Sequence, residues 1–162
     1  MKKAYFAGGC FWCMQPEFDA LDGVKKVRCG YCGGRAEDAV YEKVKAQQTL
    51  HRETIEIEYE PEKVSYARLL EVFLSSVDPF DGGGQFIDRG GSYTLAVYCT
   101  DPAERAEAEK AIAALEKSAG RRAEISLEEF TAFYPAEEYH QDYYIKNPEA
   151  FERELEESGR KR

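Results

Sequence analysis

The spacing of hydrophobic residues changes from one segment of this chain to the next, and this constrains its fold more than any other feature. Every second side chain of residues 51–60 belongs to a face made of Glu53, Ile55, Ile57 and Tyr59. Such alternation is typical of a strand with one buried side. Residues 66–77 instead have helical spacing behind Ser65, a favourable N-cap. Strands and helices mixed in this way predict a two-layer α/β sandwich.

The other segments continue this pattern along the chain. Further strands are expected over residues 3–7, 24–31, 93–100 and 122–130, and further helices over residues 10–22, 37–46 and 102–118. Residues 93–100 are apolar on both faces, which favours a central strand. Residues 78–92 form a glycine-rich loop. The chain is short enough for one domain over residues 1–162, in which residues 149–162 are a polar C-terminal helix or tail.

Charge and hydropathy exclude several classes of protein. Lys and Arg number 22 against 31 Asp and Glu, which gives a net charge of −9. An acidic chain without a basic face is not expected to bind nucleic acid or an anionic membrane. Its longest stretch without charged residues, 4–16, is shorter than the roughly 18 residues of a membrane helix. The apolar run before Cys10 is also too short for an export signal, so a cytoplasmic location is expected.

Cysteine is the residue type that points to chemistry. The five cysteines are Cys10, Cys13, Cys29, Cys32 and Cys99. An odd number in a chain without an export signal argues against a structural disulfide framework. Two C-x-x-C pairs within residues 10–32 indicate redox or metal chemistry instead.

Cys10 lies where the first strand meets the first helix. A cysteine at a helix N-terminus faces unpaired amide donors and the positive end of the helix dipole, and both stabilise the reactive thiolate. Phe11 and Trp12 place an apolar wall beside the sulfur, which suits an apolar group on a substrate. Cys13 follows one helical turn later on the same face, so it can form a disulfide with Cys10.

Glu53 is the second unusual residue. It shares a strand face with hydrophobic residues, where desolvation favours the protonated carboxyl. A protonated carboxyl near a reactive thiol is a general acid. The alternative interpretation is that Glu53, near the start of its strand, turns towards solvent.

Spacing alone leaves two rival hypotheses. The spacing of Cys10, Cys13, Cys29 and Cys32 is that of a zinc ribbon, which predicts a zinc-binding structural module. Alternatively, Cys10 and Cys13 would form the redox pair of a thioredoxin-like thiol-disulfide oxidoreductase.

Several motifs together resemble those of the peptide methionine sulfoxide reductase A family. They are Gly9-Cys10-Phe11-Trp12, Gly30-Tyr31-x-Gly33-Gly34, Tyr41-Glu42-x-Val44, His51-Arg52-Glu53, the segment from Gly84 to Gly90 with Tyr93, Tyr134-Pro135-Ala136-Glu137 and Tyr139-His140-Gln141. They occur in the family's order, and the resemblance extends over residues 4–148. We therefore expect an α+β fold, a two-layer sandwich with a ferredoxin-like core and a mixed β-sheet, that forms one catalytic domain.

The resemblance implies an enzyme that reduces methionine S-sulfoxide, free or in proteins, without a cofactor or metal. By this resemblance, Cys10 would attack the sulfoxide sulfur. Glu53 would protonate the sulfoxide oxygen, helped by the hydroxyls of Tyr41 and Tyr93. Cys10 then becomes a sulfenic acid. A second thiol converts it to a disulfide, which a thioredoxin-type reductant reduces. The substrate-binding residues implied are Phe11 and Trp12 for the methyl group and Asp88 for the backbone.

The sequence departs from the family pattern in its thiols. No cysteine follows Asn147, where resolving cysteines are common, so Cys13 is the expected resolving residue. Cys29 and Cys32 are candidates for a thiol relay from Cys13 or for a metal site. Three further departures concern efficiency and substrate range rather than reaction class: Arg52, Ser92 and Thr94.

Overall fold

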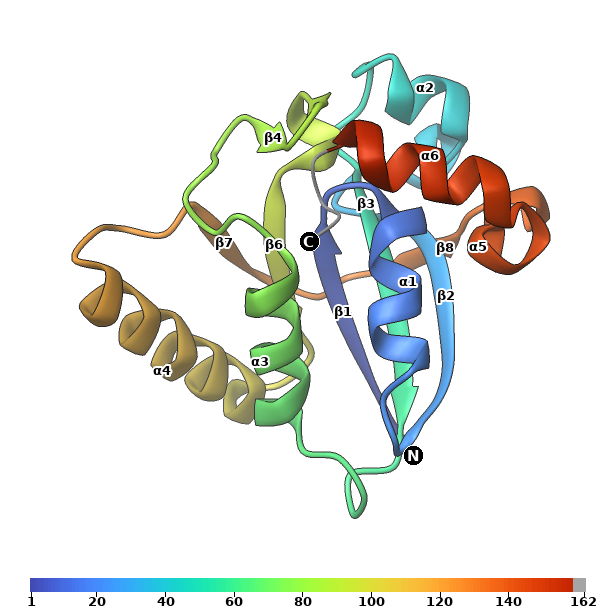
Figure 1. Cartoon of the computed structure of the whole chain (residues 1–162). Coiled ribbons are helices and arrows are strands. Elements are labelled where there is room, and N and C mark those ends of the chain that lie inside the picture. Colours follow the sequence, from blue (N-terminus) through green and yellow to red (C-terminus); the bar gives the residue numbers. More distant parts are fainter. Residues whose placement is uncertain (159–162) are drawn as a thin grey trace.

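The computed structural model describes residues 1–158 and contains a ferredoxin-like core (Figure 1). Its elements in chain order are β1 (Lys2–Gly8), α1 (Phe11–Asp19), β2 (Val24–Cys32), β3 (Arg52–Tyr59), α3 (Tyr66–Ser76) and β6 (Leu95–Cys99). The four strands lie in the order β6-β1-β3-β2, and β1 is antiparallel to both of its neighbours. Because β3 is also antiparallel to β2, strands β1 and β2 run in the same direction.

Two further strands widen this core into a six-stranded mixed sheet, β7-β6-β1-β3-β2-β8. Helix α4 (Pro102–Ala119) connects β6 to the parallel strand β7 (Ile125–Glu129), and β8 (Phe133–Pro135) pairs with β2 at the other edge. Asp101 caps α4 by accepting a hydrogen bond from the backbone N–H of Glu104. The α+β fold, the mixed sheet and the interior position of β6 confirm the sequence-based predictions.

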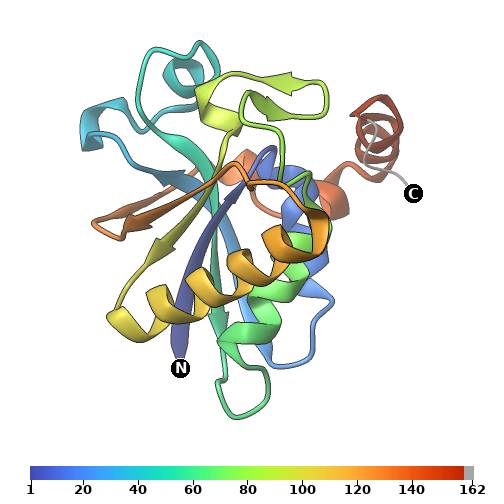
Figure 2. The same ribbon diagram turned by 90° about the vertical axis from the view of Figure 1, so that its left-hand side faces the viewer.

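Helices α1, α3 and α4 cover one face of the sheet, as the rotated view shows (Figure 2). The main core lies between these layers and includes the rings of Phe6, Phe18 and Phe73. On the other face, residues 130–133 cross from β7 to β8 and cover Tyr5 with Phe130, whose ring centroid lies 4.0 Å away. Both faces of the central strands are therefore buried.

The alternation of β3 has the expected orientation. Its inward face contains Ile55, Ile57 and Tyr59, which pack beneath the helices. The outward face is also covered, so Glu56 is buried and forms an ion pair with Arg28. The carboxylate of Glu56 on this outward face is therefore stabilised by an ion pair with Arg28 and not by water alone.

Two expected segments differ in detail. Instead of one helix over residues 37–46, a 3-10 turn η1 (Ala36–Asp38) precedes the short helix α2 (Tyr41–Lys45). The break occurs because Val40 is extended and the N–H of Tyr41 donates to the Glu137 carboxylate, 2.9 Å away. The loop 78–92 contains a hairpin of β4 (Gly84–Gln85) and β5 (Asp88–Arg89), followed by η2 (Gly91–Tyr93).

The C-terminal segment returns to the end of the sheet at which α1 begins (Figure 1). It contains η3 (Glu138–His140), α5 (Tyr143–Lys146) and α6 (Pro148–Ser158). Most of the predicted polar tail is thus helical, and its residues 159–162 lie outside the described part. Within residues 1–158 the helices are too short or too polar to cross a bilayer.

Candidate active site

The site is built around the turn from β1 into α1. Gly9 adopts a φ of 86°, which an ordinary L residue rarely accepts, and Cys10 follows as the N-cap of α1. The Cys10 carbonyl oxygen accepts hydrogen bonds from the N–H groups of Cys13 and Met14, at 3.1 and 3.3 Å. The turn therefore fixes Cys10 at the end of the sheet.

A cavity of about 170 Å³ opens beside Cys10 and gathers residues that are distant in sequence. Its lining residues are Cys10, Phe11, Trp12, Tyr41, Lys45, Glu53, Asp88, Tyr93 and Glu154. The cavity thus brings together the expected nucleophile, acid, tyrosines and substrate-binding residues. Cys13 does not line this cavity but belongs to a small cluster with Cys10 and Phe151 of α6.

Glu53 points into this cavity rather than to solvent. Only 2% of its surface is exposed, and one carboxyl oxygen accepts a hydrogen bond from the N–H of Phe11 at 3.2 Å. Burial raises the pKa of Glu53 to about 8, although the Phe11 hydrogen bond opposes this shift. The carboxyl therefore holds a proton at neutral pH, as a general acid must.

The state of the Cys10 thiol differs from the sequence-based expectation. The pKa of Cys10 is well above its ordinary value because its thiol is hydrogen-bonded to Cys13, because it is buried, and because Glu53 and Asp88 lie nearby. The expectation that the helix N-terminus stabilises a resting thiolate is wrong, because the hydrogen bond to Cys13 and burial both favour the neutral thiol. Cys10 rests as a neutral thiol.

Two tyrosines complete the polar part of the cavity. Burial, with contributions from Glu53 and Cys10, raises the pKa of Tyr41 and of Tyr93 above the ordinary tyrosine value. Both hydroxyls therefore keep their protons and can donate hydrogen bonds to an oxygen of a bound molecule.

The apolar wall is held by an aromatic cluster from the C-terminal segment. The Trp12 ring stacks on Tyr143, with centroids 4.0 Å apart, and its Nε1 donates to Nδ1 of His140 at 3.0 Å. Burial lowers the pKa of His140, so the imidazole is neutral and Nδ1 accepts this bond. The ring of Phe11 also packs against His140. This rigid wall gives an apolar group a fixed place beside the Cys10 sulfur.

The second C-x-x-C pair does not join the site. The Cys29 sulfur faces α1, where it lies 3.5 Å from Oε1 of Gln15, whereas Cys32 lies on the opposite face of the sheet beside Tyr98. In the described part of the chain, no three His, Cys, Asp or Glu side chains are grouped to hold a metal ion. The four-cysteine zinc arrangement is therefore not formed, and Cys10, Cys29 and Cys32 lie in three separate clusters.

Sequence reasoning missed two charged residues of the cavity, Lys45 and Glu154. Lys45 ends α2, and Glu154 comes from α6, which the sequence presented only as a polar tail. Phe151 and Leu155, four residues apart, gave the available signal, because an i, i+4 apolar pair marks a helix face that packs. Both pack against the cysteines, and this places Glu154 beside them at the cavity.

Cys10 lies in one cavity with the neutral acid Glu53 and is hydrogen-bonded to a second thiol, that of Cys13. This arrangement fits an oxidoreductase that works through thiol chemistry. The family model for peptide methionine sulfoxide reductase matches residues 2–162, and the chain belongs to that family of enzymes.

Individual relatives agree with this assignment. A peptide methionine sulfoxide reductase MsrA of Leuconostoc mesenteroides is 46% identical over 92% of this chain and 88% of its own length. The MsrA of Halalkalibacterium halodurans is 44% identical over 99% and 92%. Reduced Mxr1 of Saccharomyces cerevisiae superimposes with a TM-score of 0.87 at 27% identity, over 91% of this chain and 86% of that one.

Proposed function

We propose that this chain reduces methionine S-sulfoxide, free or within proteins, to methionine, with Cys10 as the nucleophile and Glu53 as the acid. The observation that carries the proposal is that both groups line one small cavity with an aromatic wall. The wall suits the methyl group of the substrate, the two tyrosine hydroxyls suit its oxygen, and Asp88 at the cavity suits the backbone of the substrate.

The first step transfers oxygen from the substrate to Cys10. The Cys10 sulfur attacks the sulfoxide sulfur while Glu53 gives its proton to the sulfoxide oxygen. Once Glu53 has given its proton to the substrate, its carboxylate can accept the proton of the Cys10 thiol. The raised pKa values of Cys10 and Glu53 fit such a coupled transfer. The oxygen ends on Cys10 as a sulfenic acid, and the thioether leaves as methionine.

The second step restores the thiol. The Cys13 sulfur attacks the sulfenic sulfur, a disulfide forms and water leaves. A dithiol reductant of the thioredoxin type then supplies two electrons and two protons. Mxr1 of Saccharomyces cerevisiae, which has the same fold, has been solved in complex with Trx2. We propose the cytoplasm as the compartment, because its thiol systems supply such a reductant, and residues 1–162 as one catalytic domain.

Mass spectrometry after one equivalent of methionine S-sulfoxide, without reductant, tests this scheme. We expect one equivalent of methionine and a single disulfide between Cys10 and Cys13. The structure favours this pair because their thiols are hydrogen-bonded. A disulfide that contains Cys29 or Cys32 would contradict the assignment of the resolving thiol. Reduction of insulin disulfides without any sulfoxide reduction would instead select the thioredoxin-like alternative, which the same cysteine pair allows.

Replacement of Cys13 by serine separates the two steps. The Cys13→Ser variant should form one equivalent of methionine at a near-normal rate, because Cys10 is intact, and then stop as a sulfenic acid. Steady-state turnover with thioredoxin should fall at least about tenfold, since the disulfide that it reduces no longer forms. A matched Cys29→Ser variant should keep full turnover. Normal turnover of Cys13→Ser would show that another thiol resolves Cys10.

A further inference from the structure

The proton donors of the site lie on three separate segments, so contacts between these segments determine where the donors lie relative to one another. Tyr41 lies on α2, Glu53 on β3, and Tyr93 ends the short turn η2 just before β6. Tyr93 therefore sits on a loop segment rather than within a strand. Its two neighbours in the chain, Ser92 and Thr94, are absent from the lining of the reaction cavity. Each of them is hydrogen-bonded to a segment that bears one of the other donors.

On one side, Ser92 is bound by Gln47. Nε2 of Gln47 donates to the Ser92 hydroxyl at 2.7 Å, and the Ser92 N–H donates to Oε1 of Gln47 at 2.9 Å. The two bonds close a ring between the side chain of Gln47 and residue 92. Gln47 follows α2 directly and has a φ of 60°, a conformation uncommon for a residue other than glycine. Because α2 bears Tyr41, this contact connects the segments of Tyr41 and Tyr93.

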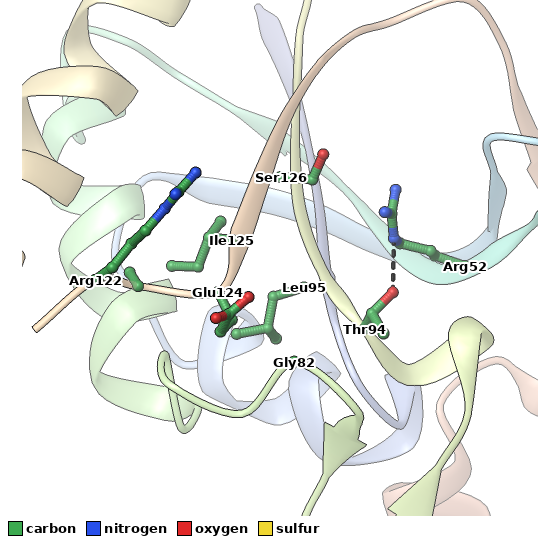
Figure 3. Close-up of a pocket in the computed structure, with 9 residues that line it drawn as sticks. Arg52, Gly82, Thr94, Leu95, Arg122, Glu124, Ile125 and Ser126 are labelled. Carbon is green, nitrogen blue, oxygen red and sulfur yellow. Dashed lines mark hydrogen bonds between the residues drawn. The ribbon is translucent and has the colours of Figure 1, made fainter.

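On the other side, Thr94 is bound by Arg52, the neighbour of Glu53 on β3. Nε of Arg52 donates to the Thr94 hydroxyl at 2.9 Å (Figure 3). That hydroxyl in turn donates to the carbonyl oxygen of Gly91 at 2.7 Å. Nη1 of Arg52 donates to the hydroxyl of Tyr98 at 3.0 Å and also forms an ion pair with Glu128. The guanidinium is therefore fixed by three partners on β6, β7 and the turn before β6.

Neither Arg52 nor Thr94 lines the cavity beside Cys10. Adjacent strand residues point to opposite faces, so Arg52 points away from the side of the sheet that Glu53 faces. Arg52 and Thr94 both line a different cavity of about 500 Å³. Figure 3 shows their side chains among the residues that line it. Because Thr94 directly follows Tyr93, an effect of this pair on the reaction passes through the backbone to Tyr93.

We propose that the Arg52–Thr94 and Gln47–Ser92 pairs position Tyr93 for catalysis by fixing both of its neighbours to the segments of Glu53 and Tyr41. The inference rests on the proposed sulfoxide reduction. Small displacements of a donor from a reacting atom weaken its action steeply, and a shift of about 1 Å can cost about 100-fold. The two pairs therefore set the reaction rate rather than the affinity for substrate.

A double-mutant cycle tests this inference in single-turnover reduction of methionine S-sulfoxide. Thr94→Val removes the hydroxyl at nearly constant volume and should lower the rate constant about tenfold, with little change in the substrate concentration at half-maximal rate. Arg52→Met should do the same. In a Tyr93→Phe background neither change should lower the rate further, because both act through the Tyr93 hydroxyl. The proposal would be overturned if Thr94→Val and Arg52→Met lowered the rate constant by the same factor in the Tyr93→Phe protein as in the wild type.

Two controls separate positioning from general stability. Thr94→Ser keeps the hydroxyl and should keep the rate. Arg28→Met removes a comparable ion pair, with Glu56, from the same face of the sheet, and should lower stability but not the rate. A wild-type protein without sulfoxide reduction would reject the proposed function itself. An active wild type whose Thr94→Val variant is equally fast would reject only the positioning role.

Discussion

Replacement of Cys10 by serine is expected to abolish methionine S-sulfoxide reduction, with a loss of at least about 10⁴-fold, the largest effect that any single change should have. The serine hydroxyl is a far weaker nucleophile than a thiol, and its oxygen cannot take up the sulfoxide oxygen as a sulfenic acid. Cys13 clusters with Cys10 but is absent from the lining of the cavity, so we do not expect it to take over the attack. Chromatographic measurement of methionine formed in a single turnover gives the rate directly.

The matched control is Cys99→Ala, which removes a buried thiol at the far end of β6 from the cavity. This variant should keep the rate, although the smaller side chain lowers stability. Cys10→Ser changes one atom and should unfold at nearly the same temperature as the wild type. Methionine formation by Cys10→Ser at more than a few per cent of the normal rate would assign the attack to a different residue.

Parts of this site could be predicted because they depend on local patterns. The alternation of residues 51–60 indicated an inward position for Glu53, with a turn to solvent as the open alternative. The strand-to-helix change at Cys10 predicted a thiol at a helix N-terminus. The spacing of the second cysteine pair also determines that its two side chains lie apart. Cys29 and Cys32 are three residues apart in one strand, and an odd separation places two side chains on opposite faces.

Other parts depend on contacts between distant segments, and local patterns do not encode these. Helix α2 begins at Tyr41 because Glu137, 96 residues later, accepts its N–H. The raised pKa of Cys10 results from its hydrogen bond to Cys13 and from burial in the assembled fold, so the helix N-terminus considered alone gave the wrong direction. The departures at Arg52, Ser92 and Thr94 looked unrelated in sequence, yet in the fold they all belong to the contacts that flank Tyr93.

Glu53→Gln is expected to lower the single-turnover rate about 100-fold to 10,000-fold, the usual contribution of a general acid. Glutamine keeps the size of the side chain and can accept the Phe11 hydrogen bond, but it has no acidic proton to give to the sulfoxide oxygen. Because the pKa of Glu53 is raised to about 8, the wild-type rate should fall as the pH rises through that value. The residual rate of Glu53→Gln should show no such fall, and Glu58→Gln, on the outward face of the same strand, should behave as the wild type.

Stability distinguishes loss of the acid from loss of the fold. Between the ordinary glutamate pKa of 4.5 and about 8, folded Glu53 holds a proton that the unfolded chain has released. The free energy of unfolding therefore falls as pH rises through this window. Glu53→Gln lacks this loss, so at pH 8 the inactive variant should resist urea better than the wild type, by up to a few kcal/mol. A variant that is slow and also less stable at pH 8 would mean that Glu53 supports the structure, and the acid would have to be sought elsewhere in the cavity.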